Sequence, residues 1–281
     1  MHRQFLRFAA GVLSLAAVIP SLAYSGNLDV LWFTAGTGDG GSFASYEDGV
    51  RNLAQQASQI SGQNVWNVTF WNAGFDPVST PPVAYNVMVV ASPQFVDGAD
   101  YSSLNSNFPT LGNRVVVTGI DADWHYLNSP GPTDFNGPFG FLANAVNWAG
   151  AGSGLGAVFL APQTNVAWSL NGLGNEVSYD NLDNIAIPDG AGIHPINSGL
   201  TADGLSNWGT SAKEAWDTVD SSRWSVLHVN GDDPTTAVTL VSVNTQSGLG
   251  EPGSATPEAT TAPLLLTAGT CIWLLRRKRI I

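Results

Sequence analysis

The stretch LDVLWFT at residues 28–34, followed by AGTGDGG at residues 35–41, decides the fold. A nearly continuous apolar run of this length is typical of a strand that is buried on both faces of a parallel sheet. After the glycine-rich stretch, apolar residues recur at helical spacing from Tyr46 to Ala57. Strand, glycine-rich turn and helix in this order predict the start of an α/β domain.

Further short runs rich in β-branched residues predict more strands of the same kind. They lie at residues 65–71, 86–91, 114–118 and 157–161. A helical pattern begins at Phe139 and ends at Gly150, just before the last of these runs. Strands separated by helix-length segments predict right-handed crossovers and a doubly wound, mostly parallel sheet of the flavodoxin-like type.

The pattern changes after Pro162, where polar and glycine-rich stretches separate short apolar pieces. These pieces lie at residues 185–187, 224–229 and 237–243, and the last two are joined by the turn sequence NGDDP at residues 230–234. We expect late strands here that extend the sheet or form a hairpin at its edge.

Charge is distributed very unevenly along the chain. Six of the ten Lys and Arg residues lie near the two termini, and all 22 acidic residues lie between residues 26 and 275, so this central part carries a net charge of −18. Such a surface repels phosphate backbones, and we therefore exclude nucleic acid as a partner.

The N-terminus has the composition of a secretory signal peptide over residues 1–25. Arg3 and Arg7 precede an apolar segment at residues 8–19, and small residues around Ala23 and Ser25 predict cleavage by signal peptidase there. The one cysteine, Cys271, lies near the other end of the chain, so the predicted exported domain, residues 26–248, has neither a disulfide nor a thiol nucleophile.

The C-terminus, residues 256–281, has three parts in a fixed order. Pro257, Glu258 and Ala259 come first, an apolar run follows at residues 262–275, and the chain closes on basic residues. These basic residues are Arg276, Arg277, Lys278 and Arg279. A Gly, Pro and Ser linker at residues 249–255 precedes the tail.

This order of parts resembles the PEP-CTERM sorting signal of Gram-negative bacteria, with Ala259 where the motif has a second proline. The resemblance implies processing by an exosortase-type membrane protease. The apolar run is shorter than the roughly 20 residues of a stable spanning helix, and the positive-inside rule keeps the basic end in the cytoplasm. An ordinary tail anchor, which keeps its basic end, requires the same topology.

The body resembles the class I glutamine-amidotransferase-like family, including its trehalose-utilisation-protein-like members. The resemblance rests on the stretches NVMVVA, GNRVVVTG, FLANAVNWA and HPINSGL at residues 86–91, 112–119, 141–149 and 194–200. In an active amidotransferase the strand-to-helix turn presents a cysteine, but the comparable turn here reads GIDAD at residues 119–123. Glutaminase chemistry is excluded because no thiolate is available to attack the amide.

Asp121, Asp123 and His125 form the candidate site. They follow a predicted strand, at the sheet edge where doubly wound folds bind ligands, and alternation along an extended chain would point all three the same way. Two carboxylates and an imidazole predict a divalent cation site, such as calcium, or an acid/base pair, and Asp39 in the glycine-rich turn is a candidate fourth ligand. The alternative is a loop network in which Asp121 caps a turn and His125 is hydrogen-bonded.

The sequence therefore predicts an exported cell-envelope or extracellular-matrix protein whose body binds a partner such as exopolysaccharide without catalysis. The alternative is a hydrolase that acts on envelope polysaccharide through the Asp/His site, with or without a metal. Trp124, which lies between Asp123 and His125, is the tryptophan that we expect to contact a ligand. His194 and His228 are expected to be structural.

Overall fold

The computed structural model describes residues 26–34, 43–60, 64–72, 84–93, 110–128, 135–161, 170, 173 and 175–243. Of these, residues 43, 44, 72, 180 and 181 are described in their backbone only. The predicted signal peptide, linker and sorting tail lie outside the described residues, as does Asp39.

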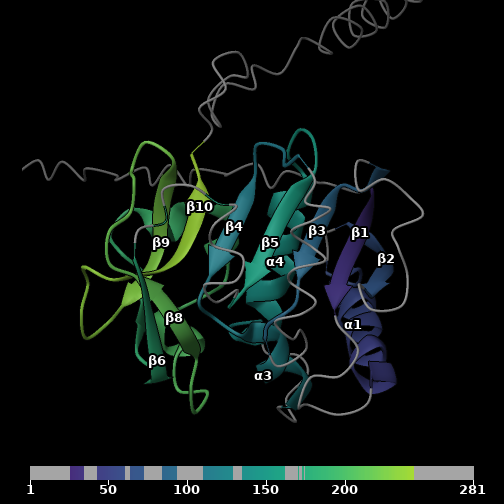
Figure 1. The fold of residues 1–281 in the computed structure, drawn as a ribbon. Coiled ribbons are helices and arrows are strands. Elements are labelled where there is room, and N and C mark those ends of the chain that lie inside the picture. The colour runs from purple at the N-terminus through teal and green to yellow at the C-terminus, as the bar shows by residue number, and fades with distance from the viewer. Residues whose placement is uncertain are drawn as a thin grey trace, which may run out of the picture. The chain divides into compact units, whose positions relative to one another are not determined.

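A parallel sheet forms the first half of the described chain (Figure 1). Its strands are β1 (Asn27–Thr34), β2 (Val65–Asn72), β3 (Val87–Val90), β4 (Val115–Thr118) and β5 (Gly156–Leu160). All five agree with the predicted strands to within one residue at each end. Every residue of β3, β4 and β5 is buried, in agreement with their continuous apolar sequences, whereas β2 alternates exposed and more buried residues as an edge strand does.

The order of these strands across the sheet is β2-β1-β3-β5-β4. A flavodoxin-type sheet has the order 2-1-3-4-5, so the last two parallel strands are exchanged here. β5 pairs with β3 through Val89 and Val158 and with β4 through Val116 and Val158. The chain therefore passes over the place of β5 to build β4 and then returns.

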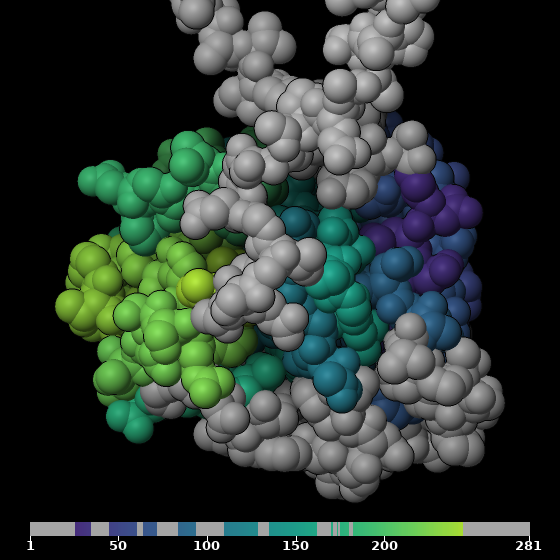
Figure 2. All heavy atoms as spheres, turned by 90° about the horizontal axis from the view of Figure 1, so that it is seen from above, coloured from purple at the N-terminus to yellow at the C-terminus, as the bar shows by residue number. Residues whose placement is uncertain are grey.

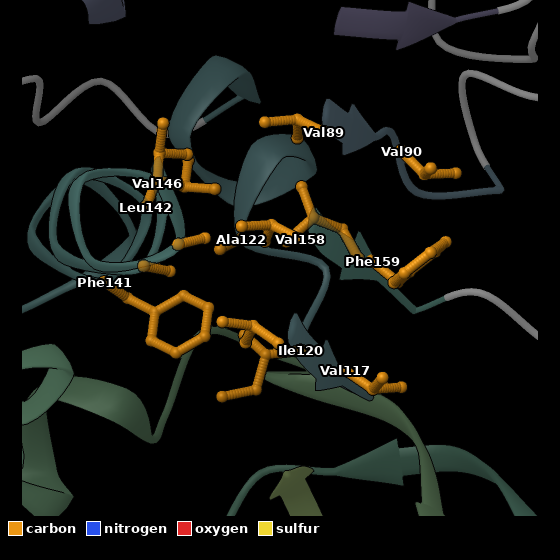
Figure 3. Packing of buried hydrophobic residues seen from close by; sticks show 14 of the residues in the cluster. Val89, Val90, Val117, Ile120, Ala122, Phe141, Leu142, Val146, Val158 and Phe159 are labelled. Carbon is orange, nitrogen blue, oxygen red and sulfur yellow. The ribbon is translucent and has the colours of Figure 1, made fainter. Parts of the chain in front are cut away.

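The helices of this half are α1 (Phe43–Ala57), α3 (Ala122–Asn128) and α4 (Pro138–Gly150). In Figure 3, Phe141, Leu142 and Val146 of α4 approach the sheet on the side of Val158, whereas Phe159 points the other way. α1 and α3 both contact α4.

Helices on both faces are predicted for a doubly wound sheet, but the described helices of this half lie together on one face. The connections from β2 to β3 and from β3 to β4 run partly through residues 73–83 and 94–109, outside the described ranges. The prediction for the second face therefore stays a prediction.

The second half of the sheet is antiparallel. It contains β6 (Glu176–Leu182), β7 (Ile185–Ala186), β8 (Ala212–Trp216), β9 (Trp224–Asn230) and β10 (Ala237–Ser242). β10 pairs with β4, β8 and β9, so the order continues as β4-β10-β8-β6. Figure 2 looks onto the top of Figure 1 and shows the same progression, from purple and blue through teal to green and yellow.

Three short helices lie between β7 and β8, namely η2 (Ala191–Ile193), η3 (Pro195–Asn197) and α6 (Ala202–Leu205). η3 packs on α4, and Asn144 of α4 donates hydrogen bonds to the carbonyls of Ile196 and Ser198. The predicted hairpin is present as β9 and β10, but β10 lies inside the sheet and not at its edge.

Candidate functional site

The polypeptide bends at Gly119 after β4 and becomes helical at Ala122. The expectation of an extended chain, which would point Asp121, Asp123 and His125 the same way, is wrong. Asp121 immediately precedes α3, and its carbonyl accepts a hydrogen bond from the amide of His125. Asp121 and His125 are therefore one helical turn apart and meet, whereas Asp123 points to a different set of partners.

Asp123 is 1% exposed and accepts hydrogen bonds from three different elements. Oδ2 accepts from the hydroxyl of Tyr46 in α1 and from the amide of Ser92 after β3, both at 3.0 Å. Oδ1 accepts from the amide of Trp124 at 3.0 Å. The Tyr46 hydroxyl in turn accepts from the indole N–H of Trp32 in β1 at 2.9 Å. This network joins β1, α1, β3 and α3 at the carboxyl ends of the strands.

Burial raises the pKa of Asp123 to about 6, and the negative charge of Asp121 acts in the same direction. The hydrogen bonds from Ser92 and Tyr46 oppose this rise because they stabilise the ionised form. At neutral pH Asp123 is consequently ionised, with donors on both oxygens.

Asp121 is fully buried and lies between two basic groups. His125 Nε2 is 3.2 Å from its Oδ1, and Lys213 Nζ of β8 is 3.7 Å from its Oδ2. The side chain of His125 is 14% exposed and that of Lys213 is 35% exposed, so the basic groups lie between Asp121 and solvent.

His125 Nε2 also lies 2.6 Å from the carbonyl oxygen of Thr210. A carbonyl only accepts, so Nε2 carries the proton and Nδ1 is the free acceptor of the neutral ring. Burial lowers the pKa of His125, but the hydrogen bond and the charge of Asp121 outweigh burial and raise it above 6.5. Trp208 packs on the imidazole, with ring centroids 5.2 Å apart.

The structure thus divides the three predicted site residues between two environments, one around Asp121 and His125 and one around Asp123. In the part of the chain that the structure describes, no three His, Cys, Asp or Glu residues are grouped so that they could hold a metal ion. Asp39 lies outside the described residues, so its role as a fourth ligand stays a prediction.

Sequence reasoning missed Tyr46 and Lys213 as members of this region. The helical spacing of apolar residues from Tyr46 to Ala57 predicts that Tyr46 is buried, but it does not indicate a partner for the Tyr46 hydroxyl. Lys213 could have been singled out as a partner for the acidic site residues, because it is one of only four Lys and Arg residues between residues 26 and 275.

His228 and His194 were expected to be structural, and both are packed in the interior or close to it. His228 is fully buried, and its Nε2 lies 2.7 Å from Oδ1 of Asn197. Burial lowers the pKa of His228 to about 3, and burial together with the nearby charge of Arg114 lowers that of His194 to about 4. Both rings are neutral at physiological pH.

Within the described ranges, no helix combines the length and the apolar character needed to cross a membrane. Comparison with known proteins gives no relative, since no family model, no curated protein and no solved structure matches this chain.

Proposed function

We propose that this chain is an exported cell-envelope protein whose α/β body acts as a non-catalytic binding or structural domain. The signal-peptide composition of residues 1–25 and the PEP-CTERM-like tail of residues 256–281 support export and exosortase-type sorting. The net charge of −18 over residues 26–275 suits an exported, soluble ectodomain and an uncharged or cationic partner, and exopolysaccharide is the partner we favour.

The observation that carries the non-catalytic part is the burial of both carboxylates. Asp121 and Asp123 are 0% and 1% exposed, and protein donors already occupy the oxygens of Asp123. A cation could bind only by displacing these donors, at a cost of roughly 1–3 kcal/mol for each group left unpaired. The arrangement supports a network that fixes strand ends and helices in place.

We further propose that the body is a variant of the flavodoxin-like, amidotransferase-like architecture that lacks the nucleophile. The β2-β1-β3 part of the sheet supports this relation, and the turn after β4 carries Asp121 with no cysteine nearby. The exchanged places of β4 and β5 make it a divergent variant.

Intact mass of the protein recovered from envelope and medium tests the proposal. We expect a product that lacks the first two dozen residues and everything beyond about Pro257. A product that retains Arg276 to Arg279 and stays in the inner membrane would replace sorting with a plain tail anchor.

The alternative function, a hydrolase on envelope polysaccharide, is favoured by one observation. The buried carboxylate of Asp121 lies 3.2 Å from the imidazole of His125, as in an acid/base dyad, the Thr210 carbonyl fixes the imidazole tautomer, and Nδ1 of His125 has no hydrogen-bond partner in the described part of the structure. Release of reducing sugar from envelope polysaccharide that the wild-type protein catalyses and a His125→Gln variant does not would establish this alternative.

Adding divalent ions distinguishes a metal-dependent hydrolase from a metal-independent hydrolase and from a non-catalytic domain. We expect the thermal unfolding midpoint to stay unchanged when calcium, magnesium or zinc is added to the chelator-treated protein. A rise with one ion that is lost in Asp121→Asn would instead establish a metal site.

A further inference from the structure

The backbone holds Lys213 and Asp121 opposite each other. The amide of Lys213 donates to the carbonyl of Gly119 at 2.9 Å, and Ala212 forms a bridge with Ile120. Gly119 packs directly against the backbone of Glu214, so close that a Cβ atom at this position would overlap it. The strand β8 and the turn after β4 are therefore fixed in register, and the two side chains meet because of this register.

The ammonium nitrogen of Lys213 lies 3.7 Å from Oδ2 of Asp121, an oxygen bonded to the carboxyl carbon Cγ. A proton carrier stands at the other oxygen of the same carboxyl group, because His125 Nε2 is 3.2 Å from Oδ1. Asp121 is fully buried, so its carboxyl carbon is shielded from solvent. An amine, a buried carboxyl group and an imidazole thus surround one carbon atom.

We propose that Lys213 and Asp121 are the partners of an intramolecular isopeptide bond, with His125 as the proton carrier. Lys213 Nζ attacks Cγ of Asp121, the bond from Cγ to Oδ1 breaks, and Oδ1 leaves as water. Of the three hydrogens of the ammonium group, one stays on the amide nitrogen and two leave with the oxygen. His125 gives its Nε2 proton to Oδ1 and regains one from Nζ, so the positive and negative charges of the pair are both lost and no other reactant is needed.

The bond would join β8 covalently to the end of β4. The body contains no cysteine, so this is a covalent connection available to it where a disulfide is not. The inference is independent of the proposed function, because it concerns the maturation of the body and not the partner that the body binds.

Tryptic digestion tests the bond directly, since Lys213 is the only Lys or Arg between Arg114 and Arg223. The full chain is kept folded at neutral pH for several days, and samples are then denatured and digested. The bond removes the free ammonium that trypsin requires. We expect cleavage at Lys213 to disappear with time, and a peptide of residues 115–223 to appear that is lighter than its sequence by one water molecule.

Two variants and one control make the result decisive. Lys213→Arg keeps the charge but offers a poor nucleophile, and His125→Gln keeps both reacting groups but slows proton transfer. We expect no water loss in the first and slower water loss in the second. A parallel sample of wild-type protein held in denaturant should remain fully cleavable. Complete cleavage at Lys213 in the aged, folded wild-type protein, with no water loss from residues 115–223, would overturn the proposal.

Discussion

Tyr46 donates a hydrogen bond from its hydroxyl to Oδ2 of Asp123 over 3.0 Å, although 77 positions separate the two residues. The same hydroxyl accepts a hydrogen bond from the indole of Trp32, so it connects β1 with α3, the helix that follows β4. A single phenolic oxygen therefore satisfies two buried polar groups, and removing it leaves both without this partner.

Tyr46→Phe is expected to lower the free energy of unfolding by about 1–3 kcal/mol, because Trp32 Nε1 loses its acceptor and Asp123 loses one donor. Urea denaturation measures the change. Tyr126→Phe is the matched control, since the Tyr126 hydroxyl has no hydrogen-bond partner among the described residues and the same atom is removed. Equal losses in the two variants would show that the network adds nothing to stability.

His228 should make the protein sensitive to acid. Its folded-state pKa is about 3, whereas its unfolded-state pKa is 6.5. Below pH 6.5 the imidazole therefore binds a proton in the unfolded chain but not in the folded chain. Relative to a His228→Gln variant, we expect the wild-type protein to lose about 1.4 kcal/mol per pH unit below pH 6.5, or about 2 kcal/mol at pH 5.

Asp123 acts with the opposite sign in part of that window. Its folded pKa of about 6 lies above the ordinary 3.8, so its contribution favours the folded state as pH falls from about 6 toward 3.8. Both proteins contain Asp123, and the difference between their unfolding free energies therefore isolates His228. A difference that does not vary between pH 7 and pH 5 would rule out the neutral, buried imidazole.

Gly119→Ala should be severely destabilising because the new methyl group would overlap the backbone of Glu214, which cannot move aside like a flexible side chain. We expect a loss of about 3 kcal/mol or more. Gly192→Ala is the control, since a Cβ atom there meets nothing within 4 Å. Chemical denaturation of both variants checks the prediction, and similar stabilities would mean that β8 can separate from the turn after β4.

The pKa of His125 should respond in opposite directions to its two charged neighbours. Asp121→Asn removes the charge that raises this pKa and leaves burial, which lowers it, so the pKa should fall. Lys213→Met removes a charge that lowers the pKa, so the pKa should rise. Titration of the His125 ring proton by NMR in the unaged protein measures both shifts. A shift in the same direction in both variants would contradict the arrangement.

The parallel strands could be predicted from sequence because a strand buried on both faces is a local signal. Residues 28–34 and 157–161 read as apolar runs without any knowledge of their neighbours, and β1 and β5 lie there. β6 (Glu176–Leu182) was missed because its sequence EVSYDNL is mostly polar, and its strand conformation depends on pairing with β8. The order of β4 and β5 across the sheet could not be predicted from the sequence either, because strand order is set by contacts between distant segments.

The geometry of the candidate site could not be predicted for a related reason. Asp121, Asp123 and His125 were found as neighbours in sequence, but their directions depend on whether the chain is extended or helical after β4. α3 has only seven residues, ADWHYLN, too few for an apolar period to be recognised. Tyr46, Ser92 and Lys213 reach these residues through the tertiary fold, and nothing local to positions 121–125 indicates them.

The position of β10 sets the order in which the protein can complete its fold. β10 is the last strand in the part of the chain that the structure describes, yet it lies between β4 and β8 and pairs with both. A chain that ends before residue 237 would lack the strand that pairs with both β4 and β8, and among the described strands only the contact between β8 and the turn after β4 would connect the two halves of the sheet. The N-terminus of a polypeptide emerges first, whether from the ribosome or from a translocation channel. The sheet can therefore be completed only after nearly all of residues 26–243 are available at once.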